Sequence, residues 1–336
     1  MSGAAPLTDS TEPTAQAIAA TLLTWFSQRQ RDLPWRRTRD PYHIWVSEIM
    51  LQQTQVRTVE PYYERFLARF PTLEALAEAD LDQVLAVWQG LGYYSRARNL
   101  HAAARMVRDR HHGQVPADLA TISALPGVGA YTAAAVLSIA FGQDLVAIDG
   151  NVKRVLSRLY DIAQDLDRAQ GQRALRAHVQ ALLPSGRAGD FNQAMMELGA
   201  TVCLPRGPLC ATCPLRAFCR AHARGVQEQR PLRRQRPATP HRQWLAAYIS
   251  RGLRLLLLRR QPQGLLGGLW ELPSIEIAPD EAPHTTLQRL LQTLSIQGEP
   301  GEQLATVRHA YTHYSLTVRV LACSLRGEPQ PAAPWD

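Results

Sequence analysis

The spacing of apolar residues predicts a helical segment over the first two thirds of the chain. From Thr14 onward, apolar side chains recur every three to four residues, and prolines precede several of the predicted helices. One helix is predicted over residues 15–29, where Thr14 can cap the first turn, and another over residues 43–59. Because no strand-like alternation interrupts this stretch, we predict an all-α domain over residues 15–221, preceded by a disordered tail, residues 1–14.

The pattern changes in the last third of the chain. Short strand-like runs occupy residues 244–249 and 253–258, and an amphipathic helix is predicted over residues 285–294. Apolar and polar side chains then alternate over residues 313–325, which is typical of a half-buried strand. We therefore predict a smaller α/β domain over residues 243–336.

Residues 222–242 separate these two segments and show no periodicity. They contain three prolines, six arginines and one acidic residue, which predicts a basic interdomain linker. The length of 336 residues also suits two domains.

Composition excludes several classes of protein. With 46% hydrophobic and 20% charged residues, the chain is globular rather than disordered, and no apolar run approaches a membrane span of about 18 residues. The first fourteen residues carry Asp9 and Glu12 but no basic residue, unlike a targeting peptide. We therefore expect a cytoplasmic, nucleoid-associated protein. The formal net charge of +8, with Lys153 as the single lysine among 36 arginines, favours a polyanionic partner; genome base composition is the alternative explanation of the many arginines.

Four of the five cysteines fall within seventeen residues, at Cys203, Cys210, Cys213 and Cys219. A disulfide framework would distribute them over a small secreted chain, so the cluster indicates a metal site. Four thiolates suit either Zn²⁺ or an iron–sulfur cluster, and structural zinc is the more common of the two. Buried cysteines without a metal are the alternative.

A short glycine-containing turn separates two predicted helices at residues 125–129. The absence of side chains at Gly127 and Gly129 permits a tight hairpin and lets a phosphate approach the backbone N–H groups. The N-terminus of the following helix adds a favourable dipole. An ordinary bend between helices is the alternative.

Two carboxylates stand out because of their surroundings. Asp149 follows an apolar run and precedes a predicted helix, whose N-terminus would keep the carboxylate ionised; a simple helix cap is the alternative. On a continuous helix, Glu48 would share a face with Gln52 and Gln55. That face is either solvated surface or a polar pocket, in which desolvation would raise the pKa of Glu48 and make it a proton donor.

A glycine-rich corner at residues 90–94 ends in Tyr93 and Tyr94 and leads into a predicted basic helix over residues 95–111. Aromatic residues at a flexible corner, followed by arginines, fit base stacking with phosphate contacts. Core tyrosines beside a solvated basic face are the alternative.

Together these motifs resemble a known family. LPGVG, a helix and then IDGNVKR are similar to the helix-hairpin-helix, Gly-Pro-Asp class of DNA glycosylases, and the cysteine segment over residues 203–219 resembles their [4Fe–4S] loop. Within that class, SEIMLQQTQV, GLGYYSRARNL and FNQAMMELGA resemble the MutY-type adenine DNA glycosylases. The resemblance spans roughly residues 20–325. It implies excision of adenine opposite 8-oxoguanine (or guanine) in base excision repair, with a Nudix-like C-terminal domain that recognises 8-oxoguanine.

The resemblance also implies roles for individual residues. Glu48 is matched to the acid that protonates adenine, Asp149 to the carboxylate that stabilises the sugar cation, and Tyr93 to a wedge beside 8-oxoguanine. The remaining residues expected to bind DNA or adenine are Arg36, Gln53, Thr54, Leu91, Gly127, Gly129, Tyr131, Asn151, Lys153, Gln193, Thr312 and His313. The [4Fe–4S] ligands would be Cys203, Cys210, Cys213 and Cys219, with Cys323 uninvolved.

Two positions depart from the patterns of related enzymes. Tyr131 stands where endonuclease III-type relatives have a Schiff-base lysine, which implies a monofunctional glycosylase. In the C-terminal domain, Thr312 replaces the serine of the Phe-Ser-His element. The predicted helix over residues 285–294 has no carboxylate, so we do not expect pyrophosphatase activity.

Three other functions are compatible with parts of the sequence. An endonuclease III-like lyase is disfavoured by Tyr131 and by the second domain, and a Nudix hydrolase with a helical appendage lacks its acidic residues. A non-catalytic iron–sulfur protein that binds DNA or senses redox state would not need Glu48. We expect a monomer whose partner is duplex DNA containing A:8-oxoguanine or A:G mispairs.

Overall fold

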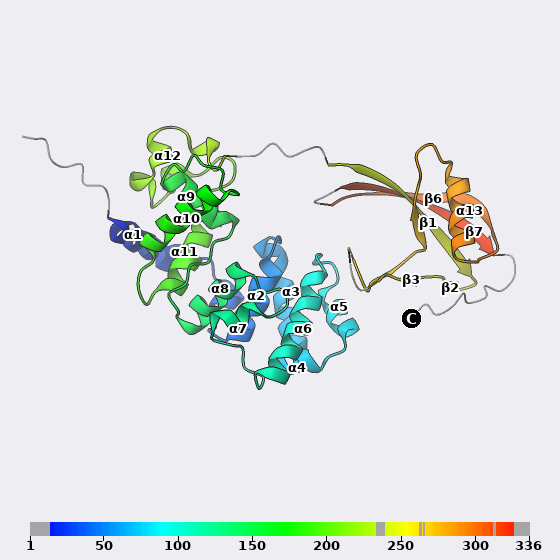
Figure 1. Cartoon of the computed structure of the whole chain (residues 1–336), viewed down its shortest axis with the longest axis horizontal. Coiled ribbons are helices and arrows are strands. Elements are labelled where there is room, and N and C mark those ends of the chain that lie inside the picture. The colour runs from blue at the N-terminus through cyan, green and yellow to red at the C-terminus, as the bar shows by residue number, and fades with distance from the viewer. Residues whose placement is uncertain (1–13, 233–238, 262–263, 265, 312–313, 326–336) are drawn as a thin grey trace, which may run out of the picture. The chain divides into compact units, whose positions relative to one another are not determined.

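The computed structural model consists of two compact units, Met1–Arg234 and Gln235–Asp336 (Figure 1). It describes residues 14–232, 239–261, 264, 266–311 and 314–325. The predicted tail therefore lies outside the described residues except for Thr14. Each unit is considered by itself.

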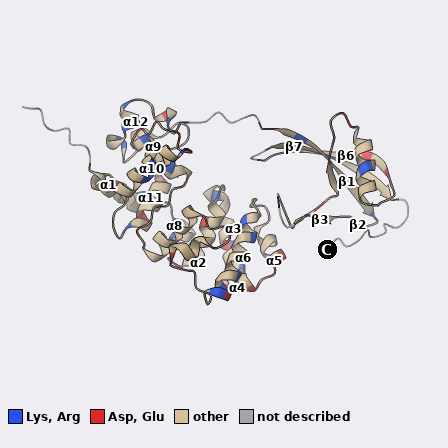
Figure 2. Ribbon diagram, viewed as in Figure 1, with Lys and Arg blue, Asp and Glu red and all other residues tan. Residues whose placement is uncertain are grey.

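Every regular element among residues 14–232 is helical, as the sequence predicts. The α-helices are α1 (Ala15–Arg29), α2 (Pro41–Leu51), α3 (Val56–Arg69), α4 (Leu73–Glu78), α5 (Leu81–Trp88), α6 (Ser95–Arg110), α7 (Leu119–Ser123), α8 (Ala130–Phe141), α9 (Gly150–Leu159), α10 (Ala169–Leu182), α11 (Ala188–Thr201) and α12 (Arg220–Ala223). Short 3₁₀ helices are η1 (Pro34–Arg36), η2 (Cys210–Thr212), η3 (Arg216–Phe218) and η4 (Gln227–Gln229). Figure 2 shows that Lys and Arg are distributed over many of these helices.

Local capping explains where several helices begin. The Thr14 side chain accepts a hydrogen bond from the Ala17 N–H at 3.2 Å, which confirms its predicted role at the start of α1. The single helix predicted over residues 43–59 is wrong: α2 ends at Leu51 and α3 begins at Val56. Gln53 has a φ of 57°, which an α-helix cannot accommodate, so the chain turns there.

Helix α11 joins two groups of helices. One group is α1, α9 and α10, and the other is α8 with its neighbour α2. One core joins α1, α9, α10 and α11 through residues such as Leu22, Leu156 and Phe191, all fully buried. α11 also packs closely on α8, since a Cβ at Gly189 would lie 2.6 Å from the Ser138 carbonyl oxygen. The close approach of these helices places residues of α8, α9 and α11 around one space.

The helical unit extends past its predicted end at Ala221. The buried Arg158 side chain donates hydrogen bonds to the carbonyl oxygens of Gln227 and Arg230, at 2.8 and 3.1 Å. Arg230 in turn forms an ion pair with Asp161 at 2.7 Å. These contacts tie residues 227–230, in the first half of the segment predicted as linker (residues 222–242), to α9 and to the residue Asp161 that follows it.

The second unit contains a five-stranded mixed sheet in the order β2–β1–β7–β6, with β5 also paired to β1. Its elements are β1 (His241–Arg251), β2 (Arg254–Leu255), β3 (Leu258–Arg259), β4 (Trp270–Glu271), β5 (Ser274–Glu276), α13 (Pro283–Thr293), β6 (Gly298–Ala310) and β7 (Ser315–Leu325). β1 and β7 are parallel, β6 and β7 are antiparallel, and β3 pairs with β4 separately. The α/β prediction is confirmed.

A small apolar core joins α13 to the sheet. Leu287 and Leu291 of α13 pack with Leu245 and Ile249 of β1 and with Leu321 of β7. β6 was not predicted from the sequence, because its residues are mostly exposed and lack an alternating pattern. Among the described residues, no helix is long and apolar enough to cross a membrane.

Candidate active site

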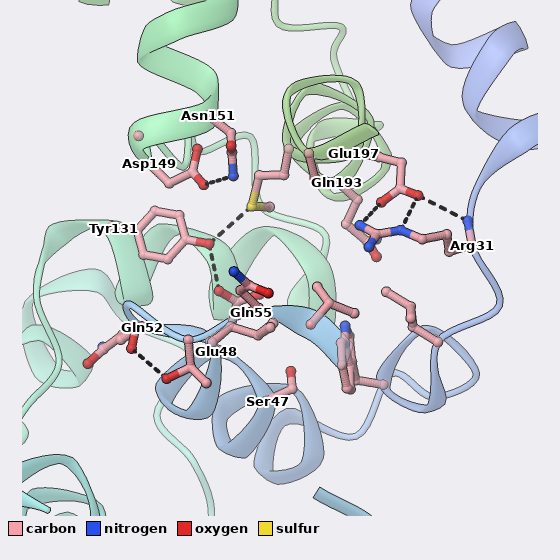
Figure 3. Close-up of a pocket in the computed structure, with 18 of the residues that line it drawn as sticks. Arg31, Ser47, Glu48, Gln52, Gln55, Tyr131, Asp149, Asn151, Gln193 and Glu197 are labelled. Carbon is pink, nitrogen blue, oxygen red and sulfur yellow. Dashed lines mark hydrogen bonds and ion pairs between the residues drawn. The ribbon is translucent and has the colours of Figure 1, made fainter. Parts of the chain in front are cut away.

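A cavity of about 1180 Å³ lies where the two groups of helices meet, and we call it the catalytic cavity (Figure 3). Many of the predicted site residues line it, although they come from distant parts of the chain. Those that matter below are Arg31, Arg36, Glu48, Gln52, Gln53, Thr54, Gln55, Tyr131, Ile148, Asp149, Asn151, Lys153, Arg154, Gln193, Met196 and Glu197.

Glu48 lies on α2 and is only 5% exposed. Its Oε2 accepts a hydrogen bond of 2.7 Å from the hydroxyl of Tyr131, in the first turn of α8. Burial raises the pKa of Glu48 to about 7, although the Tyr131 hydrogen bond and the charge of Arg36 lower it, and the charge of Asp149 raises it further. A carboxyl group with this pKa can donate a proton near neutral pH.

Asp149 is the N-cap of α9. Its carboxylate accepts hydrogen bonds from the Val152 N–H at 2.7 Å and from the Asn151 side-chain amide at 2.9 Å. Burial raises the pKa of Asp149, while these hydrogen bonds lower it. The pKa of Asp149 lies above its ordinary value, because desolvation outweighs these hydrogen bonds. The cap that the sequence offered as the alternative is present. Since Asp149 accepts several N–H donors and Glu48 accepts one phenol, a proton shared in this cavity favours Glu48.

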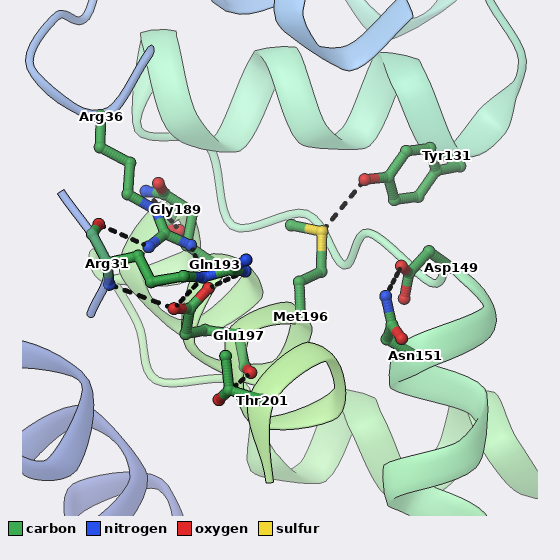
Figure 4. A network of polar contacts seen from close by, with 10 residues as sticks. All are labelled: Arg31, Arg36, Tyr131, Asp149, Asn151, Gly189, Gln193, Met196, Glu197 and Thr201. Carbon is green, nitrogen blue, oxygen red and sulfur yellow. Dashed lines mark hydrogen bonds and ion pairs between the residues drawn. The ribbon is translucent and has the colours of Figure 1, made fainter. Parts of the chain in front are cut away.

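Glu197 on α11 forms an ion-pair network with Arg31 and Arg36 at the wall of the catalytic cavity that α11 supplies (Figure 4). Although it is 1% exposed, both of its oxygens are paired: Arg31 donates at 2.8 and 2.7 Å, and Arg36 donates at 2.8 Å. Burial by itself would raise the pKa of Glu197, but these hydrogen bonds hold it at about 2. Glu197 therefore stays ionised and holds the Arg36 guanidinium at the cavity wall.

Arg31 and Glu197 were not predicted as site residues. Glu197 lies within the motif FNQAMMELGA, four residues after Gln193, so helical spacing places both on one face. Gln193 lines the same wall, and its amide nitrogen is 3.3 Å from the Gly189 carbonyl oxygen. The four-residue spacing from Gln193 is the sequence feature from which Glu197 could have been predicted as a site residue.

Gln52 and Gln55 reach the catalytic cavity from a loop and not, as predicted, from one face of a continuous helix. They do not share a helix face with Glu48, because Gln52 follows the end of α2 and Gln55 caps α3. The loop between these helices nevertheless lines the catalytic cavity with both amides and with Thr54. Glu48 thus lies beside a polar loop rather than on a polar helix face.

A smaller cavity of about 210 Å³, the corner cavity, adjoins this loop. Gln52 and Gln53 line both cavities, and Tyr93 and Gly127 line only the corner cavity. Tyr93 is 44% exposed and has a φ of 48°, a left-handed conformation that is uncommon for a tyrosine. The structure therefore brings together the loop between α2 and α3 (residues 52–55), the glycine-rich corner (residues 90–94) and the hairpin turn (residues 125–129).

Arg96 and Leu91, at the glycine-rich corner, are both buried. Arg96 does not belong to a phosphate-contacting face, because it is 7% exposed and donates to the carbonyl oxygens of Met50 and Gly92 at 2.7 and 3.1 Å. It joins the corner to the end of α2. Leu91 is 5% exposed and lines neither of these cavities. Gly129 is the N-cap of α8.

The residues that follow Asp149 form a polar connection along α9. Asn151 accepts a hydrogen bond of 2.7 Å from Arg154, which also donates to the carbonyl oxygen of Cys203 at 2.7 Å. Lys153, one turn beyond Asp149, is half-buried and lines the catalytic cavity. Tyr131, rather than a lysine, occupies the start of α8 beside Glu48.

The four clustered cysteines line one small cavity between α9 and the loop that follows α11. Arg158 Nη1 lies 3.3 Å from Cys203 Sγ, which places a buried cation beside the sulfur atoms. The described residues contain no group of three or more Cys, His or acidic side chains poised to hold one metal ion. Four thiols around one cavity with a neighbouring cation fit an anionic metal–thiolate group, and an iron–sulfur cluster is one such group. Thr312 and His313 lie outside the described residues.

Two family models match the chain, one for each unit. Residues 46–181 match the HhH-GPD superfamily of base excision DNA repair proteins, and residues 245–335 match the NUDIX domain. These matches agree with the predicted helix-hairpin-helix domain and with the Nudix-like second domain.

Characterised proteins are similar over most of the chain. The adenine DNA glycosylases of Rattus norvegicus and Homo sapiens are each 38% identical over 95% of this chain, which covers 73% and 70% of those proteins. Among solved structures, a thermostable thymine-DNA glycosylase covers 64% of this chain at 32% identity, with all of that chain matched and a TM-score of 0.59. A trapped endonuclease III–DNA covalent intermediate covers 63% of this chain and 99% of that one, at 25% identity and a TM-score of 0.54.

Proposed function

The chain belongs to the adenine DNA glycosylases, and from that premise we propose that it excises adenine mispaired with 8-oxoguanine or with guanine. As a DNA N-glycosylase of base excision repair, it hydrolyses the bond between the base and deoxyribose. The observation that carries the assignment of the active site is that Glu48, with a pKa of about 7, lines the same cavity as Asp149.

Adenine must leave the duplex to reach this cavity. Glu48 is 5% exposed, and Asp149 is half-buried, so neither carboxylate reaches a base that remains stacked. Enzymes that act on a buried base rotate the nucleotide out of the helix, at a cost of a few kcal/mol that a mispair reduces. A mispaired adenine is therefore the favoured substrate.

The two carboxyl groups suit the two halves of glycosidic cleavage. We assign proton donation to Glu48, because its protonated form persists near neutral pH and makes adenine a better leaving group. Asp149, held by the Val152 and Asn151 donors, supplies negative charge to the cationic sugar. Water completes the hydrolysis.

The wall formed by α11 suits recognition of the base. A glutamine amide can both donate to and accept from the edge of adenine, and Gln193 lies on this wall. The Glu197 network fixes Arg36 beside it. We assign Gln193 and Arg36 to the adenine pocket.

We assign the opposite base to the corner cavity and to the second unit. The half-exposed Tyr93 ring, with Gln53 and Gly127 beside it, suits insertion next to the base opposite adenine. Thr312 and His313 are proposed to contact 8-oxoguanine.

α13 contains no Asp or Glu, so the acidic residues that would bind metal for pyrophosphate hydrolysis are lacking on this helix.

We propose that Cys203, Cys210, Cys213 and Cys219 hold a [4Fe–4S] cluster. When bound, the cluster would crosslink the loop after α11 through iron–thiolate bonds. Arg158 would offset part of its negative charge from a distance of 3.3 Å to Cys203 Sγ. We further propose that the protein is monomeric and acts in the cytoplasm at the nucleoid.

The function is tested with three duplexes that place adenine opposite 8-oxoguanine, guanine or thymine. Under single-turnover conditions, the full chain should release adenine fastest from the first duplex, more slowly from the second and negligibly from the third. Equal release from all three would contradict the mispair specificity. Release of an oxidised pyrimidine without adenine release would contradict the proposal as a whole.

A further inference from the structure

A third cavity, of about 380 Å³, lies directly beside the catalytic cavity, and we call it the flanking cavity. Tyr131, Ile148 and Lys153 line both cavities, so the two share a wall formed by the starts of α8 and α9. Residues of α10 form the other side. The mechanism above uses none of the α10 residues.

Three polar residues of α10 lie along one side of that helix. Gln172, Arg176 and Gln180 are spaced four residues apart, so their side chains lie above one another on one face. All three are exposed, while Leu175 and Val179 from the same helix supply apolar contacts to the cavity. The flanking cavity thus has an apolar floor and a rim of hydrogen-bond donors.

The charges around the flanking cavity have one sign. Lys153 and Arg176 are its two charged residues, and no Asp or Glu belongs to its lining. Within the described parts of the chain, neither cationic side chain forms a hydrogen bond or ion pair, and the side-chain amides of Gln172 and Gln180 have no hydrogen-bond partner either. Two cations and two amides above an apolar floor form a site for an anion.

We propose that the flanking cavity binds a phosphodiester of the DNA strand that carries the extruded adenosine. Arg176 and Lys153 supply the charge, and Gln172 and Gln180 supply neutral hydrogen bonds. This inference rests on the proposed function and adds α10 to the surface that holds the substrate. The shared wall places the bound phosphate next to the sugar in the catalytic cavity, so its role is to fix that sugar in position.

An exit path for excised adenine explains the cavity less well. Adenine is neutral at physiological pH, so two cations without a counter-ion add little to its binding. A phosphodiester carries a full negative charge, and guanidinium groups bind phosphate through two parallel hydrogen bonds. The charge therefore favours the backbone over the base.

Arg176→Gln tests the proposal, with Arg173→Gln as the matched control. Arg173 lies on the same helix, is exposed and does not line the flanking cavity, so its replacement removes the same charge from the same region. Binding of the full-length protein is measured on a duplex with 2′-fluoro-2′-deoxyadenosine opposite guanine, which resists cleavage because fluorine destabilises the sugar cation. Arg176→Gln should weaken binding about tenfold at low salt and reduce the salt slope by about 1. Arg173→Gln should have less than half of that effect on the slope.

A second measurement identifies the phosphate. The phosphates that flank the fluorinated adenosine are replaced one at a time by neutral methylphosphonates. At one position, the replacement should weaken binding of the wild-type protein more than binding of Arg176→Gln, because the variant has already lost the Arg176 contact and only the Lys153 charge remains to be lost. Additive losses at every position, or equal effects of Arg173→Gln and Arg176→Gln, would overturn the proposal.

The two proposals fail separately in this design. Coupling between Arg176 and one phosphate, together with absent excision from any adenine mispair, would leave the phosphate site standing and contradict the proposed function. Excision from the mispairs without such coupling would support the proposed function and contradict the phosphate site. Thermal melting of both variants verifies that each is folded.

Discussion

The Tyr131 hydroxyl donates a 2.7 Å hydrogen bond to Oε2 of Glu48 inside the catalytic cavity. Burial raises the pKa of Glu48, and this hydrogen bond opposes the rise because it stabilises the ionised carboxylate. The resulting pKa of about 7 leaves a large share of Glu48 protonated near neutral pH. Burial therefore raises the pH range in which Glu48 can act as an acid, and Tyr131 limits that rise.

Replacing Tyr131 with phenylalanine should move the pH profile of excision. The wild-type rate should fall as the pH rises through about 7, because Glu48 loses the proton it donates. Without the Tyr131 donor the pKa rises further, so the alkaline limb of Tyr131→Phe should lie at higher pH. Single-turnover rates from about pH 5 to about pH 9 measure this. An alkaline limb at lower pH than in the wild type would contradict the assignment.

Lys153 should account for whatever lyase activity the protein has. It is the single lysine of the chain and lines the catalytic cavity one turn after Asp149, where it can approach the abasic sugar. We expect weak trapping with borohydride, and we expect Lys153→Gln to abolish it while adenine release continues, slowed only by the loss of one of the two cations of the flanking cavity. Trapping that persists in Lys153→Gln would assign the amine to the N-terminus instead.

The residues that carry chemistry were largely predictable because they lie in short motifs. Glu48, Asp149, Tyr93 and Gly127 were found in this way, and the structure brings them to adjoining cavities. The break after Leu51 was not predictable, because it depends on Arg96, which binds carbonyl groups at the end of α2 from 46 residues away. Local periodicity carries no information about such a distant donor.

Burial was the other quantity that the sequence did not supply. The sequence placed Asp149 at a helix N-terminus, but it did not reveal that desolvation raises the pKa of this carboxyl group. Glu197 was overlooked because its importance depends on Arg31 and Arg36, which are more than 150 residues earlier. The α10 face of the flanking cavity likewise becomes visible only beside Lys153.

Removing the second unit should reduce discrimination rather than chemistry. A protein that ends at Arg234 keeps the contacts of Arg158 with Gln227 and Arg230, and it keeps both carboxylates. It should excise adenine but lose preference for 8-oxoguanine over guanine in the opposite strand. Rates on the two duplexes, compared with those of the full chain, measure the preference. Undiminished preference in the folded truncated protein would remove 8-oxoguanine recognition from this unit.

Anaerobically purified protein should be yellow-brown and contain about four irons per chain. Cys323→Ser is the matched control, because Cys323 is buried in the core of the second unit, away from the four clustered cysteines in sequence. It should retain its iron, whereas Cys213→Ser should lose most of it. Stoichiometric zinc without iron would contradict the cluster assignment.

The central claim is that Glu48 donates the proton that releases adenine. Glu48→Gln keeps the shape of the side chain and can still interact with Tyr131, but its amide cannot act as an acid. The decisive measurement is the single-turnover rate of adenine release by this variant at saturating enzyme, on the duplex with 8-oxoguanine opposite adenine, with binding to the same duplex measured in parallel. We predict near-normal binding and a rate lowered by about 10²–10⁴-fold or more. A rate close to that of the wild type would contradict the account.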